Sequence, residues 1–121
     1  MSDSTAHVMI RYSDDAAIIE CLDSKLNDLM TIQTWSDELL AAIDSSLSKD
    51  RVIVSFSNVK FMSSSALRAL ITLKNKADEK GIFLFLCNID ANNMEVFKIT
   101  KLDHFFRITR TELEAQRAVL K

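Results

Sequence analysis

The sequence contains no proline and a single glycine, Gly81, among its 121 residues. No repeat, low-complexity segment or linker divides it, and one glycine cannot build a glycine-rich phosphate-binding loop. With 48% hydrophobic residues, the chain is long enough to bury one core. We therefore predict a single domain over residues 1–121. Residues 1–6 are polar, and we expect them to be flexible.

Basic charge, long apolar runs and cysteine are scarce as well. The formal net charge is −2, which argues against a nucleic-acid surface, where a basic stripe would be expected. No apolar run reaches the length of a membrane span, and residues 1–7 lack the basic start and apolar stretch of a signal peptide. Cys21 and Cys87 both lie in apolar segments. We expect buried free thiols, a reducing compartment and hence a cytoplasmic location.

Patterns for catalysis or metal binding are missing too. His7 and His104 lie far apart, and neither has a cysteine or carboxylate pattern suited to metal or nucleophile chemistry. We expect no metal, no cofactor and no enzymatic activity.

The most informative stretch covers residues 52–73 and reads VIVSFSNVKFMSSSALRALITL. Its first five residues form an apolar, β-branched run typical of a buried strand. Three serines follow, and apolar residues then recur at helical spacing. Ser63 or Ser64 can act as N-cap, because its oxygen accepts from a free amide of the first turn. The partial positive charge of a helix N-terminus would also favour a phosphate on an adjacent serine.

The remaining elements follow from periodicity and capping patterns. Gly81 is in a natural C-terminal cap position, and Thr111 with Glu114 has capping-box spacing. We predict strands at Val8–Tyr12, Ala16–Leu22, Val52–Phe56, Phe83–Cys87 and Phe106–Ile108. We predict helices at Met30–Leu47, Ala66–Lys80, Asn92–Ile99 and from Thr111 to about Leu120.

This order of elements predicts a small α/β sandwich. An initial hairpin adds an antiparallel edge, while strands that alternate with helices pair in parallel through right-handed crossovers. The sheet would be mixed, with four or five strands, and the helices would lie mostly on one face. Large apolar side chains are assigned to packing against it: Trp35, Met94, Phe97, Phe105 and Phe106, with Val96 as a further candidate.

The stretch VIVSFSNVKFMSSSALRAL resembles the signature of STAS domains, the family named for sulphate transporters and anti-sigma-factor antagonists. In that family the strand is followed by an apolar pair and then Asp-Ser-Ser/Thr-Gly-Leu. Phe61-Met62 matches the apolar pair, and Ser64, Ser65 and Leu67 match the two hydroxyls and the leucine. Ser63 stands in place of the family's aspartate, and Ala66 in place of its glycine.

Two further segments carry the resemblance. Residues 99–106, ITKLDHFF, are similar to the family's late Thr-Gly-Leu-Asp segment, with Lys101 in the glycine's place. Residues 24–27, SKLN, lie where many members have Gly-x-Leu-Asp, so that Ser24 replaces a glycine and Asn27 a carboxylate.

The resemblance implies a STAS fold and a function in partner switching. In the antagonist branch, a partner serine kinase phosphorylates the first hydroxyl after the aspartate, which corresponds to Ser64. The implied partner is an anti-sigma factor with serine kinase activity: binding would release a sigma factor, and phosphorylation would reverse binding. Because Ser63 lacks a fixed charge, we hypothesise that the protein is either poorly phosphorylated or permanently competent to bind.

Residues beside the serines complete the predicted site. Arg68 lies one helical turn after Ser64 and could contact an acidic patch of the partner or neutralise a phosphate. The alternative is structural: the serines cap a helix and fill a tight turn, and Arg68 is solvated. The predicted partner-binding residues are Asn27, Asp28, Ser63, Ser64, Ser65, Arg68 and Thr72.

A second function fits the same resemblance. STAS domains also serve as small cytoplasmic subunits of lipid-transport ABC systems, where they dock without a phosphoswitch. Loss of the aspartate fits that role as well.

Overall fold

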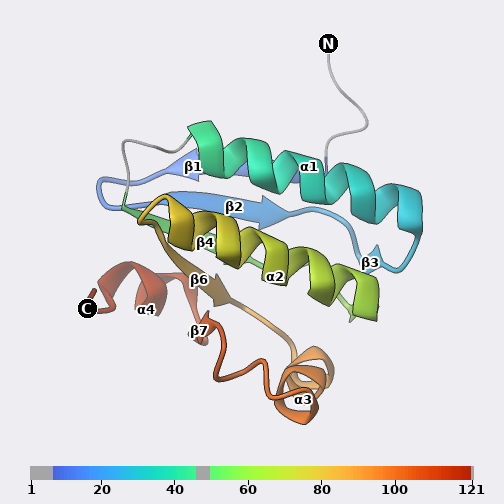
Figure 1. The fold of residues 1–121 in the computed structure, drawn as a ribbon. Coiled ribbons are helices and arrows are strands. Elements are labelled where there is room, and N and C mark those ends of the chain that lie inside the picture. The colour runs from blue at the N-terminus through green and yellow to red at the C-terminus, as the bar shows by residue number, and fades with distance from the viewer. Residues whose placement is uncertain (1–6, 46–49, 121) are drawn as a thin grey trace.

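The computed structural model describes residues 7–45 and 50–120 (Figure 1). Its strands are β1 Val8–Tyr12, β2 Ala17–Cys21, β3 Lys25–Leu26, β4 Arg51–Ser55, β5 Phe61–Met62, β6 Phe83–Cys87 and β7 Arg107–Ile108. Its helices are α1 Leu29–Ser45, α2 Ser64–Glu79, α3 Ala91–Ile99 and α4 Glu112–Arg117. The flexible tail predicted for residues 1–6 and the predicted end of the first helix at Leu47 lie outside the described residues.

Five strands form one mixed sheet in the order β1-β2-β4-β6-β7. β1 pairs antiparallel with β2 through the turn at Ser13, whose amide donates to the Ala16 carbonyl over 2.9 Å. The other neighbours pair in parallel, and α1, α2 and α3 make the crossovers. The predicted mixed sheet with one antiparallel edge is confirmed.

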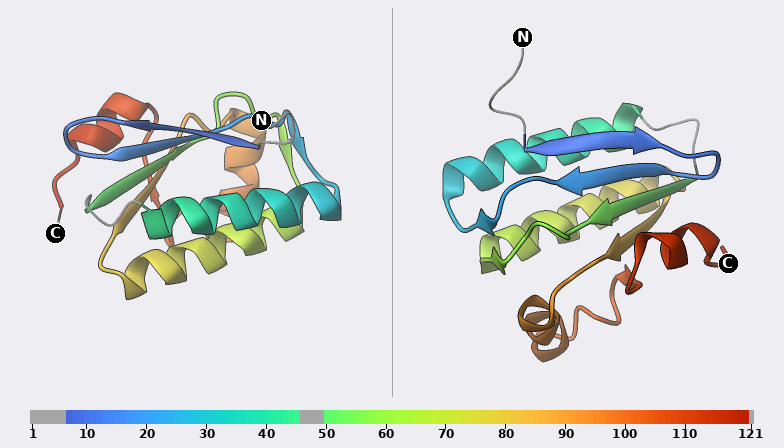
Figure 2. Two further views of the ribbon diagram at one scale, coloured as in Figure 1. Left: turned by 90° about the horizontal axis from the view of Figure 1, so that it is seen from above. Right: turned by 180° about the vertical axis from the view of Figure 1, so that it is seen from behind.

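The helices cover the two faces of the sheet unequally. α1 and α2 run side by side along one face, and α4 lies alone on the other (Figures 1 and 2). The larger core lies under α1 and α2. Its largest fully buried side chains are Trp35, Phe56, Phe97, Ile19, Leu26, Leu39, Ile43, Leu70, Leu73 and Leu86. Since burial of one large apolar side chain contributes roughly 1.5–3 kcal/mol, this core supplies most of the hydrophobic stabilisation.

The smaller core lies under α4. It consists of Ala16, Ile18, Ile53, Phe85, Cys87 and Ala115. Because side chains alternate along a strand, neighbouring residues belong to different cores: Ile18 packs under α4, and Ile19 packs under α1 and α2. Every residue of β4 is buried, as expected for a central strand with both faces covered.

Several details differ from the predictions. Val96 is exposed, because α3 turns only Asn93 and Phe97 fully inward and leaves Met94 half-buried. Phe105 is also exposed at the surface, where its ring meets that of Phe106 edge to face. α4 ends at Arg117 and does not reach Leu120.

The predicted helix ends agree with the structure in two places. Gly81 has φ of +72°, and it follows Lys80, the C-cap of α2, in the left-handed conformation that glycine adopts without strain. Thr111 is the N-cap of α4, and its hydroxyl accepts from the amide of Glu114 over 3.1 Å. The Glu114 carboxylate accepts from the amide of Arg110, one residue before the cap.

Candidate functional site

We call residues 63–65, the three serines at the start of α2, the serine turn. Two very short strands, which the sequence did not reveal, hold it in place. β3 and β5 pair in parallel, with Leu26 opposite Met62. At the end of this ladder the amide of Ser63 donates to the Leu26 carbonyl over 2.9 Å. The ladder brings the start of α2 next to Asn27. Both long helices therefore begin at the same end of the sheet (Figure 1).

The three serines have different environments. Ser63 is the N-cap of α2: it has extended backbone angles, and its Oγ accepts from the amide of Ala66 over 3.4 Å. Ser65 is half-buried beside α1. Ser64 is the first residue of the helix, is exposed, and makes no side-chain hydrogen bond within the described part of the chain. Of the three hydroxyls, that of Ser64 is the most accessible to a modifying enzyme.

The N-terminus of α2 carries no acidic side chain in its first turn. A long helix has partial positive charge at this end, and an anion placed there is stabilised by roughly 0.3–1 kcal/mol. Ser63 caps the helix without adding the negative charge that an aspartate would supply. The helix end is therefore open to a negative group on Ser64 or on a partner.

Asp28 and Asn27 differ in their hydrogen bonding: Asp28 is bonded to the start of α1, and the Asn27 side chain is not. The Asp28 carboxylate accepts from the amide of Thr31 over 3.0 Å, and its carbonyl accepts from the amide of Ile32. Asp28 thus caps α1, a role that the sequence prediction did not assign to it. Asn27 is exposed, and among the described residues its side chain has no hydrogen-bond partner.

A groove of about 410 Å³ runs between α1 and α2 beside the serine turn. Ser65, Arg68 and Thr72 line it from α2, and Leu29 and Gln33 line it from α1. Arg68 is the only charged residue of the lining, and within residues 7–45 and 50–120 its guanidinium makes no ion pair. The Thr72 hydroxyl donates to the Arg68 carbonyl over 3.3 Å, which leaves its oxygen free to accept a hydrogen bond from a partner.

Exposed apolar side chains flank the serine turn, and the sequence prediction missed them. Leu29 and Met30, in the first turn of α1, are 73% and 77% exposed, and Phe61 in β5 is 48% exposed. The sequence did contain a signal, because Leu29 and Met30 fall outside the apolar stripe that begins at Ile32. Clustered exposed apolar groups of this kind are typical of a protein-binding surface.

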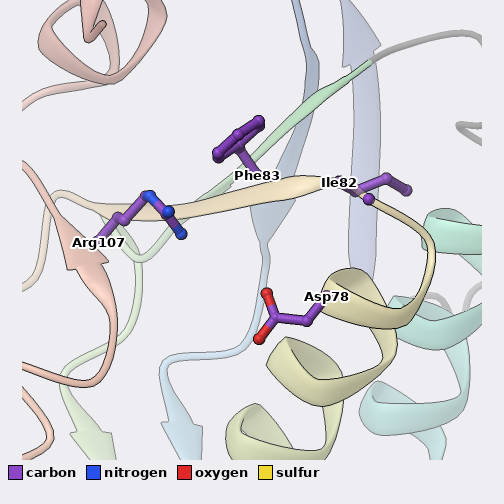
Figure 3. Close-up of a pocket in the computed structure, with 5 residues that line it drawn as sticks. Asp78, Ile82, Phe83 and Arg107 are labelled. Atoms are coloured by element: carbon purple, nitrogen blue, oxygen red, sulfur yellow. The ribbon is translucent and has the colours of Figure 1, made fainter. Parts of the chain in front are cut away.

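Other parts of the molecule offer less to a ligand. In the cleft of Figure 3, Asp78 is already paired with Lys74 over 2.8 Å, and Arg107 stacks on the Phe83 ring. Its volume of about 190 Å³ is below the usual 300–1,000 Å³ of small-molecule sites.

His7 Nδ1 lies 2.6 Å from an Asp23 carboxylate oxygen, a pairing that the sequence did not predict. No trio of histidine, cysteine or acidic side chains in the described ranges could hold a metal.

The two thiols are buried and unpaired, as predicted. Burial raises the pKa of Cys21 to about 12, against a hydrogen bond from Trp35 Nε1 that lowers it. Burial likewise raises the pKa of Cys87 to about 11. A thiol with so high a pKa is a poor nucleophile at neutral pH. Among the described helices, none is long and apolar enough to cross a membrane.

The family model of the STAS domain matches residues 15–115, from the turn before β2 into α4. The chain belongs to the STAS domain family. The serine turn, the SKLN segment and the ITKLDHFF segment that carry the resemblance all fall within the matched residues.

Several solved structures of anti-sigma-factor antagonists are similar to this STAS domain in fold. An anti-sigma-factor antagonist domain protein from Planctomyces limnophilus is 18% identical, with a TM-score of 0.79 over 92% of this chain and 96% of that one. An anti-sigma factor antagonist from Mycobacterium paratuberculosis is 16% identical, with a TM-score of 0.77 over 95% of each chain. The Bacillus cell fate determinant SpoIIAA in its phosphorylated form is 19% identical, with a TM-score of 0.64 over 89% and 95%. At these identities the likeness shows a shared fold.

Proposed function

We propose that this STAS domain is a non-enzymatic anti-sigma-factor antagonist, which acts by binding an anti-sigma factor with serine kinase activity. The observation that carries the proposal is the exposed Ser64 at the start of α2, beside an apolar groove. The antagonists among its structural neighbours support this choice of partner.

The partner would dock on the surface formed by the serine turn and the α1/α2 groove. Binding energy is commonly concentrated in a few large side chains that become buried at the centre of an interface. Leu29 lines the groove together with Ser65, and Met30 and Phe61 are exposed at the start of α1 and in β5, so these three side chains would supply the anchors. Arg68 and Asn27 would form polar contacts at the rim, where both have free hydrogen-bonding groups.

Phosphorylation of Ser64 would reverse binding through charge and hydration. A phosphate adds a charge of roughly −1.5 to −2 and three acceptor oxygens, which would have to be desolvated beneath the partner. The N-terminus of α2 and Arg68, one helical turn away, would stabilise the phosphate in the free protein. The modified serine would therefore favour the dissociated state.

The cap residue distinguishes this chain from the family pattern. Ser63 gives the helix a neutral cap, so no fixed carboxylate lies beside Ser64 to help orient it or to recruit a metal ion held by the kinase. We expect slow phosphorylation or permanent competence to bind. A kinase assay that gave full modification of Ser64 would contradict this part of the proposal.

The test is an affinity pull-down from native cell extract with wild type, Ser64→Ala and Ser64→Asp. We expect wild type and Ser64→Ala to recover a kinase-like anti-sigma factor, and Ser64→Asp to lose it. Ser45→Asp is the matched control, because Ser45 is also exposed but lies at the far end of α1. Recovery of membrane transport subunits by all four proteins would instead support the lipid-transport ABC role, in which Ser64 is only a turn residue.

A Leu29→Ser, Met30→Ser double variant tests the docking surface separately. Both side chains are exposed, so we expect the fold to be retained and the affinity for the recovered partner to fall at least about tenfold. Unchanged affinity would place the interface elsewhere on the domain. Leu113→Ser is the matched control, because Leu113 is similarly exposed on α4.

A further inference from the structure

The second face of the sheet is closed by α4, a helix of only six residues. We propose that α4 is a lid, which opens by local unfolding while the rest of the domain stays folded, and that Arg51 controls how often it opens. This inference does not depend on the proposed function, because α4 lies on the face opposite α1 and α2 (Figure 2).

Apolar packing alone holds α4 weakly. A six-residue helix is not stable by itself in water, and it must be held by contacts with the rest of the protein. Within α4 only Ala115 is buried, while Leu113 points to solvent and is 53% exposed. Ala118 and Leu120, which follow the helix, are half-buried against the smaller core. The apolar area that α4 itself buries is therefore small.

Arg51 makes the principal polar attachment. Its Nη1 donates to the carbonyls of Ala115, over 2.7 Å, and Gln116, and its Nη2 donates to the carbonyl of Ala118 over 2.7 Å. These are carbonyls at the C-terminal end of α4, where the helix carries partial negative charge. The guanidinium also lies 5.4 Å from the centre of the Phe85 ring. Arg51, the first residue of β4, thus supplies the hydrogen-bond donors for the free carbonyls at the C-terminal end of α4.

The closed arrangement leaves Arg51 incompletely satisfied. The side chain is 8% exposed, and its Nε is buried without a hydrogen-bond partner. The unpaired Nε makes the closed state less stable than a fully hydrogen-bonded one, but the three hydrogen bonds from Nη1 and Nη2 to α4 outweigh that cost and favour closure. A hollow of about 390 Å³ beside the guanidinium is lined by Asp15 and Asp50. With α4 displaced, water and these carboxylates could solvate the guanidinium in place of the α4 carbonyls.

Opening would leave the larger core intact. The sheet is held from its other face by α1 and α2, whose buried side chains do not contact α4. The displaced lid would uncover an apolar surface made by Ile18, Ile53 and Phe85, together with the thiol of Cys87. Cys21 would stay covered, because it lies in the larger core and accepts from Trp35 Nε1. The two cysteines therefore report on the two faces separately.

The experiment measures thiol labelling by iodoacetamide under native conditions, in Cys21→Ala and Cys87→Ala proteins that each retain one thiol. We expect Cys87 to be labelled at least about ten times faster than Cys21, because local opening is cheaper than global unfolding. In an Arg51→Met background we expect Cys87 labelling to rise about 10- to 100-fold, as for lost hydrogen bonds to a charged group, with little change at Cys21.

Two further variants make the outcome decisive. Arg107→Met removes an arginine that stacks on Phe83 of the same sheet but, among the described residues, donates no side-chain hydrogen bond to α4, and we expect labelling to be unchanged. Glu112→Gln weakens the hydrogen bonds from Arg11 to α4, of 2.9 and 3.2 Å, and we expect a small rise at Cys87 alone. Far-UV circular dichroism checks that each variant is folded. Equal labelling rates for the two thiols, or equal acceleration of both by Arg51→Met, would overturn the proposal.

Discussion

The two faces of the sheet differ in how they are covered and in what they carry. One is packed against two long helices that bury Trp35 and many branched side chains, and the serine turn lies at its end. The other is closed by a single short helix that buries Ala115 and is tied down by Arg51. The larger core can hold a binding surface in a fixed geometry, whereas the smaller one can change without loss of the fold.

Neighbouring isoleucines in β2 test this difference most strongly. Ile19 packs in the larger core and Ile18 in the smaller one, and both are fully buried. We expect Ile19→Ala to lower the free energy of unfolding by about 4 kcal/mol and Ile18→Ala by about 2 kcal/mol, because α4 can move into the cavity. Urea denaturation of both variants measures this. Equal losses would mean that the two faces are equally rigid.

The two thiols extend the comparison to alkaline pH. Their pKa values are raised to about 12 for Cys21 and about 11 for Cys87 in the folded protein. Above pH 9 the unfolded chain releases these protons while the folded chain keeps them, so stability falls as pH rises. We expect a loss of about 1 kcal/mol per thiol between pH 9 and 10. The two thiols together make the free energy of unfolding fall as the pH rises. In denaturation curves recorded from pH 9 to 10, Cys21→Ala and Cys87→Ala should each show about half of this thiol-dependent fall. A full wild-type slope in both would assign the loss to other groups.

Backbone strain at the margin of the larger core gives a smaller effect. Lys101, just after α3, has φ of +64°, where a side chain is unfavourable and glycine is not. We expect Lys101→Gly to stabilise the domain by about 0.5–1 kcal/mol, measured as a rise in Tm. Asn88 has a similar φ of +60°, but its amide donates to Ser55 Oγ over 3.0 Å. Asn88→Gly should therefore give no rise in Tm. A rise in Tm for both variants would show that the hydrogen bond from Asn88 to Ser55 does not stabilise the domain.

The helix caps give the smallest expected effect. Ser63 caps α2, whose first turn has no acidic residue, whereas Thr111 caps α4, whose first turn already carries Glu112 and Glu114. A carboxylate at the N-cap of α2 would interact with a helix end that carries no other negative charge. We therefore expect Ser63→Asp to raise the free energy of unfolding by about 0.5 kcal/mol. Thr111→Asp should add nothing, because of repulsion from the two glutamates. Thermal unfolding at low salt compares the two, and an equal gain would show that local charge does not matter.

Much of the fold could be predicted from the sequence because long apolar patterns determine it. The stripe through Ile32, Trp35 and Leu39 and the glycine at position 81 gave α1 and the end of α2. β3 and β5 could not be found, because two residues show no periodicity and their pairing is non-local. Val96 was placed inward as a candidate because it is apolar, but α3 is short and packs through one narrow stripe.

The candidate site was predictable in part. Resemblance to the family gave Ser64, and the structure shows that it is the exposed serine of the three. The apolar side chains at Leu29 and Met30 were overlooked because they sit at a helix start, where a boundary is uncertain by a residue or two. The attachment of α4 to Arg51 could not be foreseen, since its partners are backbone carbonyls far along the chain.

The pairing of β3 with β5 has a consequence for the order of folding. The serine turn receives its geometry from the hydrogen bond between the Ser63 amide and the Leu26 carbonyl, which joins segments separated by all of α1 and β4. Non-local contacts of this kind form only after loop closure has been achieved, and they form late. We therefore expect that a partially folded or nascent chain does not yet display the turn in its final shape. Recognition of this surface would by itself select molecules that have completed folding.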